Sequence, residues 1–190
     1  MAKPRILVFA GSIRTGAFSG KLAALAAKEL TLGDNEVSLI SLADYAMPLY
    51  DADLEARDGA PSAAKKLRGM MLAHRGVFIV TPEYNASLPP LLKNAIDWVS
   101  RAKEPAASPF RECVFALGST SDGWRGGYRA IMALRQVLEL GLETLVVPEM
   151  VSVPGARTGF DEAGDLKEER WAKQLRRTLD RLVALCEAER

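Results

Sequence analysis

The segment from Gly11 to Ala23, GSIRTGAFSGKLA, carries residue types that bind phosphate groups. Ser12 and Ser19 supply hydroxyl donors, and Arg14 supplies a positive charge for a charge-assisted pair. The segment joins a predicted strand to a predicted helix, so backbone N–H groups and the positive end of a helix dipole would face an anion. Its glycine spacing matches neither G-x-G-x-x-G nor G-x-x-x-x-G-K-[ST]. The segment therefore predicts a phosphate site, with an ordinary turn and helix cap as the alternative.

Two further polar loops follow apolar runs. The first, TPEYNASLPPLLKNAIDW at 81–98, offers the Tyr84 ring and backbone amides that can line a flat heteroaromatic ring. Its alternative interpretation is a rigid connection in which Asn85 or Ser87 caps a helix. The second loop, GSTSDGWRGG at 118–127, holds four glycines, which let the backbone approach a ligand closely. A flexible turn explains this second loop nearly as well.

Each of these loops lies between a predicted strand and a predicted helix. The predicted strands are Arg5–Ala10, Glu36–Ser41, Gly76–Thr81, Glu112–Leu117 and Leu142–Val147. The predicted helices are Phe18–Leu30, Pro61–Ala73, Leu88–Val99, Gly126–Leu140 and Leu166–Ala188. The stretches Ala43–Ala60 and Ser152–Asp165 are expected to be irregular.

The alternation of strands and helices predicts an α/β fold, a three-layer doubly wound sheet of parallel strands with right-handed crossovers. The 190 residues suit a single domain covering 1–190. In an open sheet of this kind, ligands bind outside the carboxyl ends of the strands. All three polar loops are expected at that edge.

The charge balance excludes several partner classes. Lys and Arg number 25 against 24 Asp and Glu, a net charge of +1, so there is no electrostatic basis for binding nucleic acid or a membrane surface. No stretch approaches the ~18 apolar residues of a membrane span.

The distant pair Cys113 and Cys186 forms no metal or redox motif, which favours a reducing, cytoplasmic setting. His74, the single histidine, is expected to contact the last carbonyls of a helix rather than to catalyse.

Three motifs together resemble one known family, the NADPH-dependent FMN reductases. They are PEYNASLPPLLKNAIDW at 82–98, the G-S-x-R turn at 11–14 and S-x-G-x-x-G-G at 121–127. The similarity runs from Ile6 to about Pro148. This family is flavodoxin-like and includes flavin, quinone and chromate reductases. The resemblance implies strand order 2-1-3-4-5, bound FMN, and NADPH or NADH as co-substrate.

The resemblance also implies roles for individual residues. The FMN phosphate would be held by Ser12, Arg14 and Ser19. The isoalloxazine ring would lie along Pro82, Glu83, Tyr84 and Asn85, with Ser87 nearby. The far part of the flavin would contact Ser119, Ser121 and Gly123. Relatives often carry Ser and Asn at the positions of Ala17 and Ser19, a departure that affects the phosphate contacts. No protein acid, base or nucleophile is required, because the flavin supplies the chemistry. We therefore predict no catalytic side chain and no metal site.

Three functions fit these residues. The leading one is an NAD(P)H-dependent oxidoreductase that passes electrons through FMN to a small acceptor, such as a quinone, flavin, azo compound or metal oxyanion. The alternatives are a flavodoxin-like electron carrier, against which the near-neutral charge weighs, and a non-enzymatic flavin-binding module. Relatives form dimers and tetramers, so a homodimer or homotetramer is expected. The residues do not specify the acceptor or the choice between NADPH and NADH.

Overall fold

A single five-stranded sheet forms the centre of the computed structural model, which describes residues 3–103 and 106–188. The strands are β1 (Arg5–Ala10), β2 (Glu36–Ile40), β3 (Gly76–Thr81), β4 (Val114–Thr120) and β5 (Leu145–Val153). Their order is β2-β1-β3-β4-β5, and all four ladders are parallel. This confirms the predicted three-layer doubly wound sheet with order 2-1-3-4-5, the order of flavodoxin-like folds.

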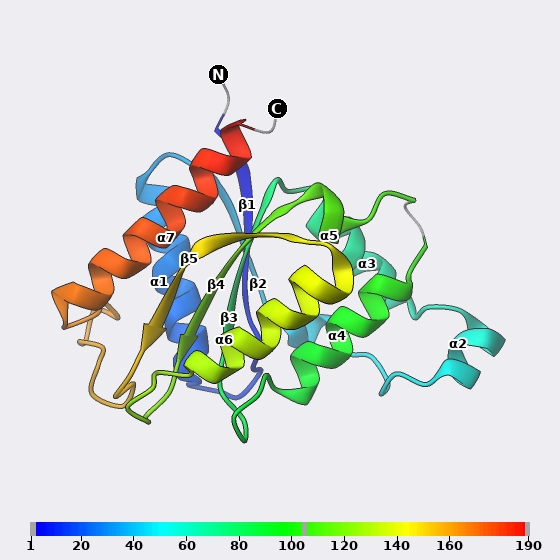
Figure 1. The fold of residues 1–190 in the computed structure, drawn as a ribbon, viewed down its shortest axis with the longest axis horizontal. Helices are drawn as coiled ribbons and strands as arrows, with labels where there is room; N and C mark the ends of the chain where they lie inside the picture. Colours follow the sequence, from blue (N-terminus) through cyan, green and yellow to red (C-terminus); the bar gives the residue numbers. More distant parts are fainter. Residues whose placement is uncertain (1–2, 104–105, 189–190) are drawn as a thin grey trace.

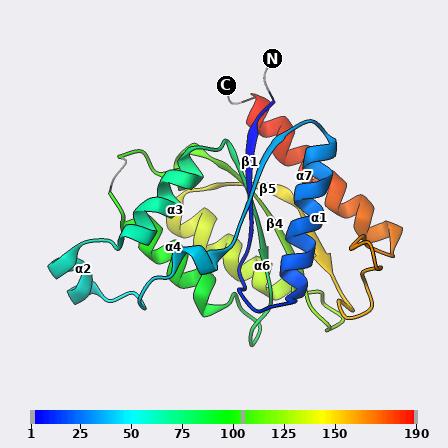
Figure 2. The same cartoon turned by 180° about the vertical axis from the view of Figure 1, so that it is seen from behind.

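Helices cover both faces of the sheet (Figures 1 and 2). The helices are α1 (Phe18–Leu32), α2 (Ala52–Asp58), α3 (Ser62–Leu72), α4 (Pro90–Arg101), α5 (Pro109–Glu112), α6 (Tyr128–Arg135) and α7 (Glu169–Ala188), with short helical segments at Leu42–Tyr45 and Gln136–Gly141. Helices α1 and α7 pack on one face, and α3, α4, α5 and α6 pack on the other. Because both faces are covered, β3 and β4 are buried along their whole length.

Alternation along the strands divides the core between the two faces. Ile6 and Val8 of β1 contribute to the cluster beneath α1 and α7. Leu7 and Phe9 contribute to the cluster beneath α4 and α6. Successive side chains of a strand point to opposite faces, so one apolar run serves two cores. The runs of β1 and β3 were predicted with the same ends as observed, because each is bounded by polar or glycine-rich turns.

The predicted ends of α6 and β5 were wrong. Helix α6 begins at Tyr128 rather than at Gly126, because Gly126 and Gly127 adopt positive φ values of 61° and 85° that a right-handed helix excludes. Strand β5 extends to Val153 instead of ending at Val147, and begins at Leu145. It passes through Pro148 at an irregularity in its pairing with β4, which an edge strand tolerates because one side needs no ladder hydrogen bonds.

The stretch expected to be irregular, Ala43–Ala60, contains the short helix α2, which projects from the body of the molecule in both views (Figures 1 and 2). Asp51 caps it by accepting hydrogen bonds from the backbone N–H groups of Asp53 and Leu54. No residue of α2 is buried. The chain before α2 contacts α4 through a hydrogen bond, in which the Pro48 carbonyl accepts from the Trp98 indole N–H at 2.8 Å.

Candidate functional site

The three polar loops lie side by side at the carboxyl edge of the sheet. The N–H of Gly11, which opens the first loop, donates to the carbonyl of Val80 in β3 at 2.8 Å. Thr81, at the end of β3, pairs in register with Ser119 of β4. A Cβ atom added at Gly11 would lie 2.9 Å from the side chain of Leu92, so glycine lets the first loop approach α4 closely. The strand order therefore brings together segments that are far apart in the sequence.

The first loop leaves the start of α1 open to an anion. Ala17 occupies the N-cap position, no side chain caps the helix, and its first turn holds no acidic residue. Backbone N–H groups there have no partner within the helix. Ser19 lies in this first turn with 1% of its surface exposed, and its hydroxyl has no hydrogen-bond partner in the described part of the chain. Ser12 accepts a hydrogen bond from the Arg14 N–H at 3.3 Å, and the Arg14 side chain is exposed.

The second loop contains a tight hairpin. The N–H of Tyr84 donates to the Ser87 carbonyl at 2.9 Å, and the N–H of Ser87 donates back at 3.0 Å. Between them, Asn85 and Ala86 have positive φ values of 47° and 66°, the pattern of a type I′ turn. Asparagine tolerates this conformation, whereas alanine is strained in it. The turn holds the Tyr84 ring at the rim of the site with 47% of its surface exposed, and half-buried Pro82 begins the loop.

Glu83 is the buried charge of this site. Its carboxylate oxygen Oε1 accepts from Nε of Arg129, in α6, at 2.9 Å, and the guanidinium makes a second bond through Nη2. Only 9% of the Glu83 side chain is exposed. Its second oxygen, Oε2, is buried and has no hydrogen-bond partner among the described residues. The ion pair joins the second loop to the start of α6, and the free oxygen could accept a hydrogen bond from a ligand.

The third loop is fixed by hydrogen bonds to its own backbone and to β5. The hydroxyl of Ser119 is buried and donates to the Gly126 carbonyl at 2.7 Å, so it shapes the loop from inside. The N–H of Ser121 donates to the Val153 carbonyl at 3.2 Å. Gly123 is exposed at the outer turn. Added Cβ atoms would collide at Gly126 and at Gly127, where the nearest contact, with Ser119 Cβ, would be 2.9 Å.

All the residues predicted for the site thus lie in the three loops at one edge, and three further residues were missed. Arg129 was missed because its partner Glu83 stands 46 positions away in the sequence. The available signal, an arginine next to a glycine-rich loop, is weak. Trp124 and Arg125 lie in the third loop, with the guanidinium 3.9 Å from the centre of the indole ring. A tryptophan followed by an arginine in a glycine-rich loop could have been singled out from the sequence.

Similarity to known proteins identifies the family. The family model for NADPH-dependent FMN reductase matches residues 4–158. The chain belongs to the NADPH-dependent FMN reductase family. A quinone reductase of Escherichia coli (strain K12) is 38% identical over 136 residues, covering 72% of this chain and 70% of that protein. An NAD(P)H-dependent FMN reductase of Pseudomonas aeruginosa is 34% identical over 181 residues, covering 94% of this chain and 92% of that protein.

A solved structure agrees with this family over the whole fold. The flavoenzyme NAD(P)H:(acceptor) oxidoreductase FerB from Paracoccus denitrificans superposes with a TM-score of 0.74 at 28% identity. The alignment covers 97% of this chain and 98% of that one. The predicted resemblance is therefore confirmed, as is the flavodoxin-like fold. As in the rest of the FMN reductase family, FMN is the cofactor, and NAD(P)H is the co-substrate.

The donor set of this FMN reductase site fits FMN. An uncapped helix start, the buried Ser19 hydroxyl and the exposed Arg14 suit a phosphate group. The backbone groups of the second and third loops and the free Glu83 oxygen suit a flat ring with several N–H and carbonyl groups. Two buried oxygens without partners at one sheet edge are expected where a ligand completes the hydrogen bonds.

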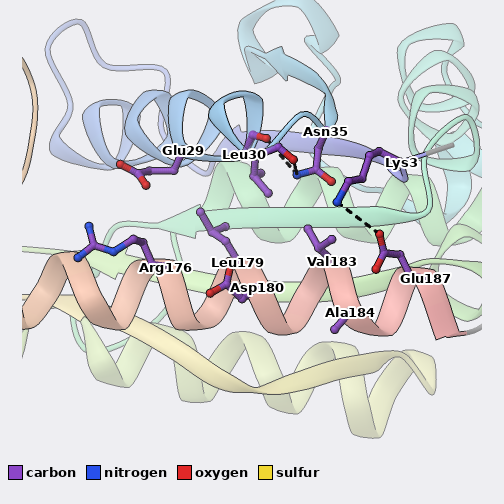
Figure 3. A pocket seen from close by; sticks show the side chains of 11 residues that line it. Lys3, Glu29, Leu30, Asn35, Arg176, Leu179, Asp180, Val183, Ala184 and Glu187 are labelled. Atoms are coloured by element: carbon purple, nitrogen blue, oxygen red, sulfur yellow. Dashed lines mark hydrogen bonds and ion pairs between the residues drawn. The ribbon is translucent and has the colours of Figure 1, made fainter. Parts of the chain in front are cut away.

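A cleft between α1 and α7 is less suited to an anionic cofactor (Figure 3). Its volume is about 260 Å³, and it lies at the opposite end of the sheet, beside Lys3 at the start of β1. Glu29, Asp180 and Glu187 place three carboxylates around it, and Lys3 pairs with Glu187 at 3.8 Å. Arg176 also lines it, so three carboxylates stand beside two cations, and this small excess of negative charge disfavours phosphate binding there.

Cys113 and His74 contact backbone carbonyls near the end of α3. Cys113 is buried and donates to the carbonyls of Met71 at 3.4 Å and His74 at 3.3 Å. Burial raises the pKa of the Cys113 thiol to about 12, so it is not a thiolate near neutral pH. Nδ1 of His74 lies 2.7 Å from the Met70 carbonyl, which confirms the predicted contact at the end of α3. None of the described helices is long and apolar enough to cross a membrane.

Proposed function

We propose that this protein transfers electrons from NADPH or NADH, through FMN bound at the three loops, to a quinone-type acceptor. In the overall reaction a hydride leaves the reduced nicotinamide, and the quinone gains two electrons and two protons to become a hydroquinone; one of these protons comes from solvent. The observation that carries the proposal is the pair of buried, unpartnered oxygens of Ser19 and Glu83 at the edge where the loops meet. The relatives named quinone reductase support the acceptor class.

Each loop has a distinct task in this proposal. When bound, FMN would supply the chemistry that takes up a hydride and passes the electrons to the second substrate. The start of α1, with Ser12, Arg14 and Ser19, holds the phosphate and so fixes one end of the cofactor. The hairpin from Pro82 to Ser87 lines one edge of the ring. The loop with Ser121 and Gly123 lines the other, and Ser119 fixes the shape of that loop from inside.

The protein's contribution to rate is positioning. The hairpin bonds between Tyr84 and Ser87 and the bond from Ser119 to Gly126 hold both ring-lining loops before any ligand arrives. Holding two flat rings in contact removes much of the entropic barrier to a hydride transfer. Backbone N–H groups near the ring would stabilise the charge that develops on it. No side-chain acid or base is needed in this scheme.

The exposed surface at α2 supports a proposal about assembly. We propose a homodimer or homotetramer, since α2 has no buried residue and Leu49 before it is 77% exposed. Light scattering would test this, and a mass equal to one chain would contradict it.

We also propose a cytoplasmic location, where NAD(P)H is supplied and where the two free cysteines stay reduced.

The test is an absorption spectrum. The purified protein is mixed with FMN, desalted, and then mixed with NADPH or NADH without oxygen. Retained flavin peaks that bleach with a nicotinamide and return when a benzoquinone is added would support the proposal. Retained flavin that neither nicotinamide bleaches would indicate an electron carrier instead. Loss of all flavin on desalting, at micromolar protein, would contradict a resident cofactor.

A further inference from the structure

A groove of about 310 Å³ opens beside the third loop. It is lined by Trp124 and Arg125 of the loop, Tyr128 of α6, Ser152 of β5 and Trp171 of α7. The groove is thus continuous with a loop of the proposed flavin site. It lies at the same carboxyl edge of the sheet, beyond the end of β5.

The groove displays aromatic faces and a positive charge. The Trp124 side chain is 78% exposed, and Tyr128 is 45% exposed. Exposed rings gathered on one surface are a feature of interaction sites. The Arg125 guanidinium stacks on the Trp124 ring, which leaves the edge of its N–H groups free for an anion.

Arg125 also lacks a counter-charge within the described residues, unlike the other cations around this loop. Arg129 pairs with Glu83, and Arg157 pairs with Asp122 at 2.9 Å. No ion pair joins Arg125 to a carboxylate in the described part of the chain, and no acidic residue lines the groove. The cleft of Figure 3, by contrast, is lined by three carboxylates as well as by Lys3 and Arg176. The groove therefore suits an anionic ligand with a flat ring.

Contacts with β5 fix the backbone that carries these side chains before binding. The hydroxyl of Ser152 donates to the Arg125 carbonyl at 2.9 Å. Gly126 packs so closely on β5 that an added Cβ atom would lie 2.8 Å from the Pro154 nitrogen. Preorganised groups lose little conformational freedom on binding, so the contacts contribute more fully to affinity.

We propose that this groove binds the adenosine–phosphate arm of the reduced nicotinamide dinucleotide, a proposal that rests on the proposed function. When the nicotinamide ring lies against the flavin, the other end of the dinucleotide must extend over the neighbouring surface. That end carries a flat base and phosphate charge, which match the Trp124 ring and Arg125. Aromatic stacking of a base contributes enough to change affinity about tenfold or more.

The first experiment measures binding without turnover. Adenosine 2′,5′-bisphosphate is titrated into the FMN-loaded protein and into the flavin-free protein while tryptophan fluorescence is recorded. The signal can report the groove because Trp124 and Trp171 line it, whereas Trp98 is buried. Saturable quenching is expected, with the dissociation constant about tenfold higher in Trp124→Ala and Arg125→Gln. Equal dissociation constants in these variants and in the wild type would overturn the proposal.

Matched controls remove comparable groups elsewhere. Leu140→Ala removes a large side chain that is 81% exposed, and Arg176→Gln removes a charge from the cleft between α1 and α7. Both controls should bind the bisphosphate as the wild type does. A similar loss in the controls would show that the probe does not report the groove, and would overturn the proposal.

The second experiment separates binding from chemistry. In steady-state turnover, Trp124→Ala and Arg125→Gln should raise the KM for the nicotinamide far more than they lower kcat, while FMN retention stays at the wild-type level. An increase with NADPH alone assigns Arg125 to the 2′-phosphate, and an equal increase with NADH assigns it to the pyrophosphate. A loss of FMN, or dissociation of an assembly with KM unchanged, would overturn the proposal.

The outcomes of these experiments distinguish the proposed function from the proposed role of the groove. If the wild-type flavin is not bleached by any nicotinamide, the proposed function fails, whatever the fluorescence titration shows. If the flavin is bleached but the bisphosphate does not quench fluorescence, only the groove's role fails.

Discussion

Nε of Arg129 lies 2.9 Å from Oε1 of Glu83, which joins the start of α6 to the loop after β3. This hydrogen bond raises the pKa of Arg129, while one oxygen of the buried Glu83 carboxylate is left for another donor. The pair therefore positions two loops of the proposed flavin site relative to each other. Its removal should affect cofactor binding more strongly than an ordinary surface ion pair would.

Replacement of this arginine tests the link. In Arg129→Ala, the Glu83 carboxylate is buried without a counter-charge, so the FMN dissociation constant should rise about tenfold or more. Arg129→Lys should recover part of the affinity. The control Arg111→Ala breaks an exposed pair with Glu143 and should leave FMN binding within about twofold. Equal FMN affinity in Arg129→Ala and Arg111→Ala, measured by fluorescence titration, would rule out the positioning role.

Ser19→Ala should separate stability from binding. The hydroxyl is buried without a partner among the described residues, so its loss should leave the flavin-free protein as stable, or up to about 1 kcal/mol more stable. The FMN dissociation constant should rise about fivefold to tenfold, because a donor to the phosphate is lost. Thr31→Ala, at the other end of α1, removes a hydroxyl bonded to the Ala27 carbonyl and should not change FMN affinity. A destabilised Ser19→Ala protein with unchanged FMN affinity would refute the assignment.

Gly127→Ala should destabilise the third loop. Gly127 has a φ of 85°, and an added Cβ atom would lie 2.9 Å from Ser119 Cβ. Strain of this kind costs about 1–3 kcal/mol, which urea unfolding would detect as a lower midpoint. Gly141→Ala is the control, since no atom lies within 4 Å of its added Cβ and its φ is not positive. Equal midpoints for the two variants would contradict the packing described for Gly127.

His74 should make folding sensitive to mild acid. Burial lowers its pKa below the usual 6.5, in spite of the opposing hydrogen bond to Met70. Nδ1 therefore donates to the Met70 carbonyl, and Nε2 accepts from the Ser38 hydroxyl at 2.8 Å. Because the unfolded chain takes up a proton first as the pH falls, the free energy of unfolding should decrease from about pH 6.5 downward through the lower native pKa.

The variant His74→Gln isolates this contribution. Its unfolding free energy should be nearly independent of pH between about 6.5 and 5, whereas that of the wild type falls over the same range. Carboxylates titrate mainly below this window, so the difference between the two curves reports the histidine. Parallel curves for the two proteins in urea titrations would show that His74 does not carry the effect.

Strands β1 and β3 and the three polar loops could be predicted because their signals are local. The apolar runs Arg5–Ala10 and Gly76–Thr81 stand between polar or glycine-marked turns, and both ends of each strand were predicted. The ends of α6 and β5 were mispredicted. The positive φ values of Gly126 and Gly127 and the path of β5 through Pro148 depend on packing between loop and edge strand, which no local pattern records.

The sequence by itself determined the alternation of strands and helices, the loops that carry polar and glycine residues, and the family motifs within them. These features follow from residue periodicity and backbone preference over a few positions. Only the tertiary structure decided that Arg129 reaches Glu83, that Ser119 bonds inward to Gly126, and that Trp124 and Arg125 face a groove shared with α7. Such contacts join segments distant in the chain, and they exist because parallel strands in the order β2-β1-β3-β4-β5 bring their carboxyl ends to one edge.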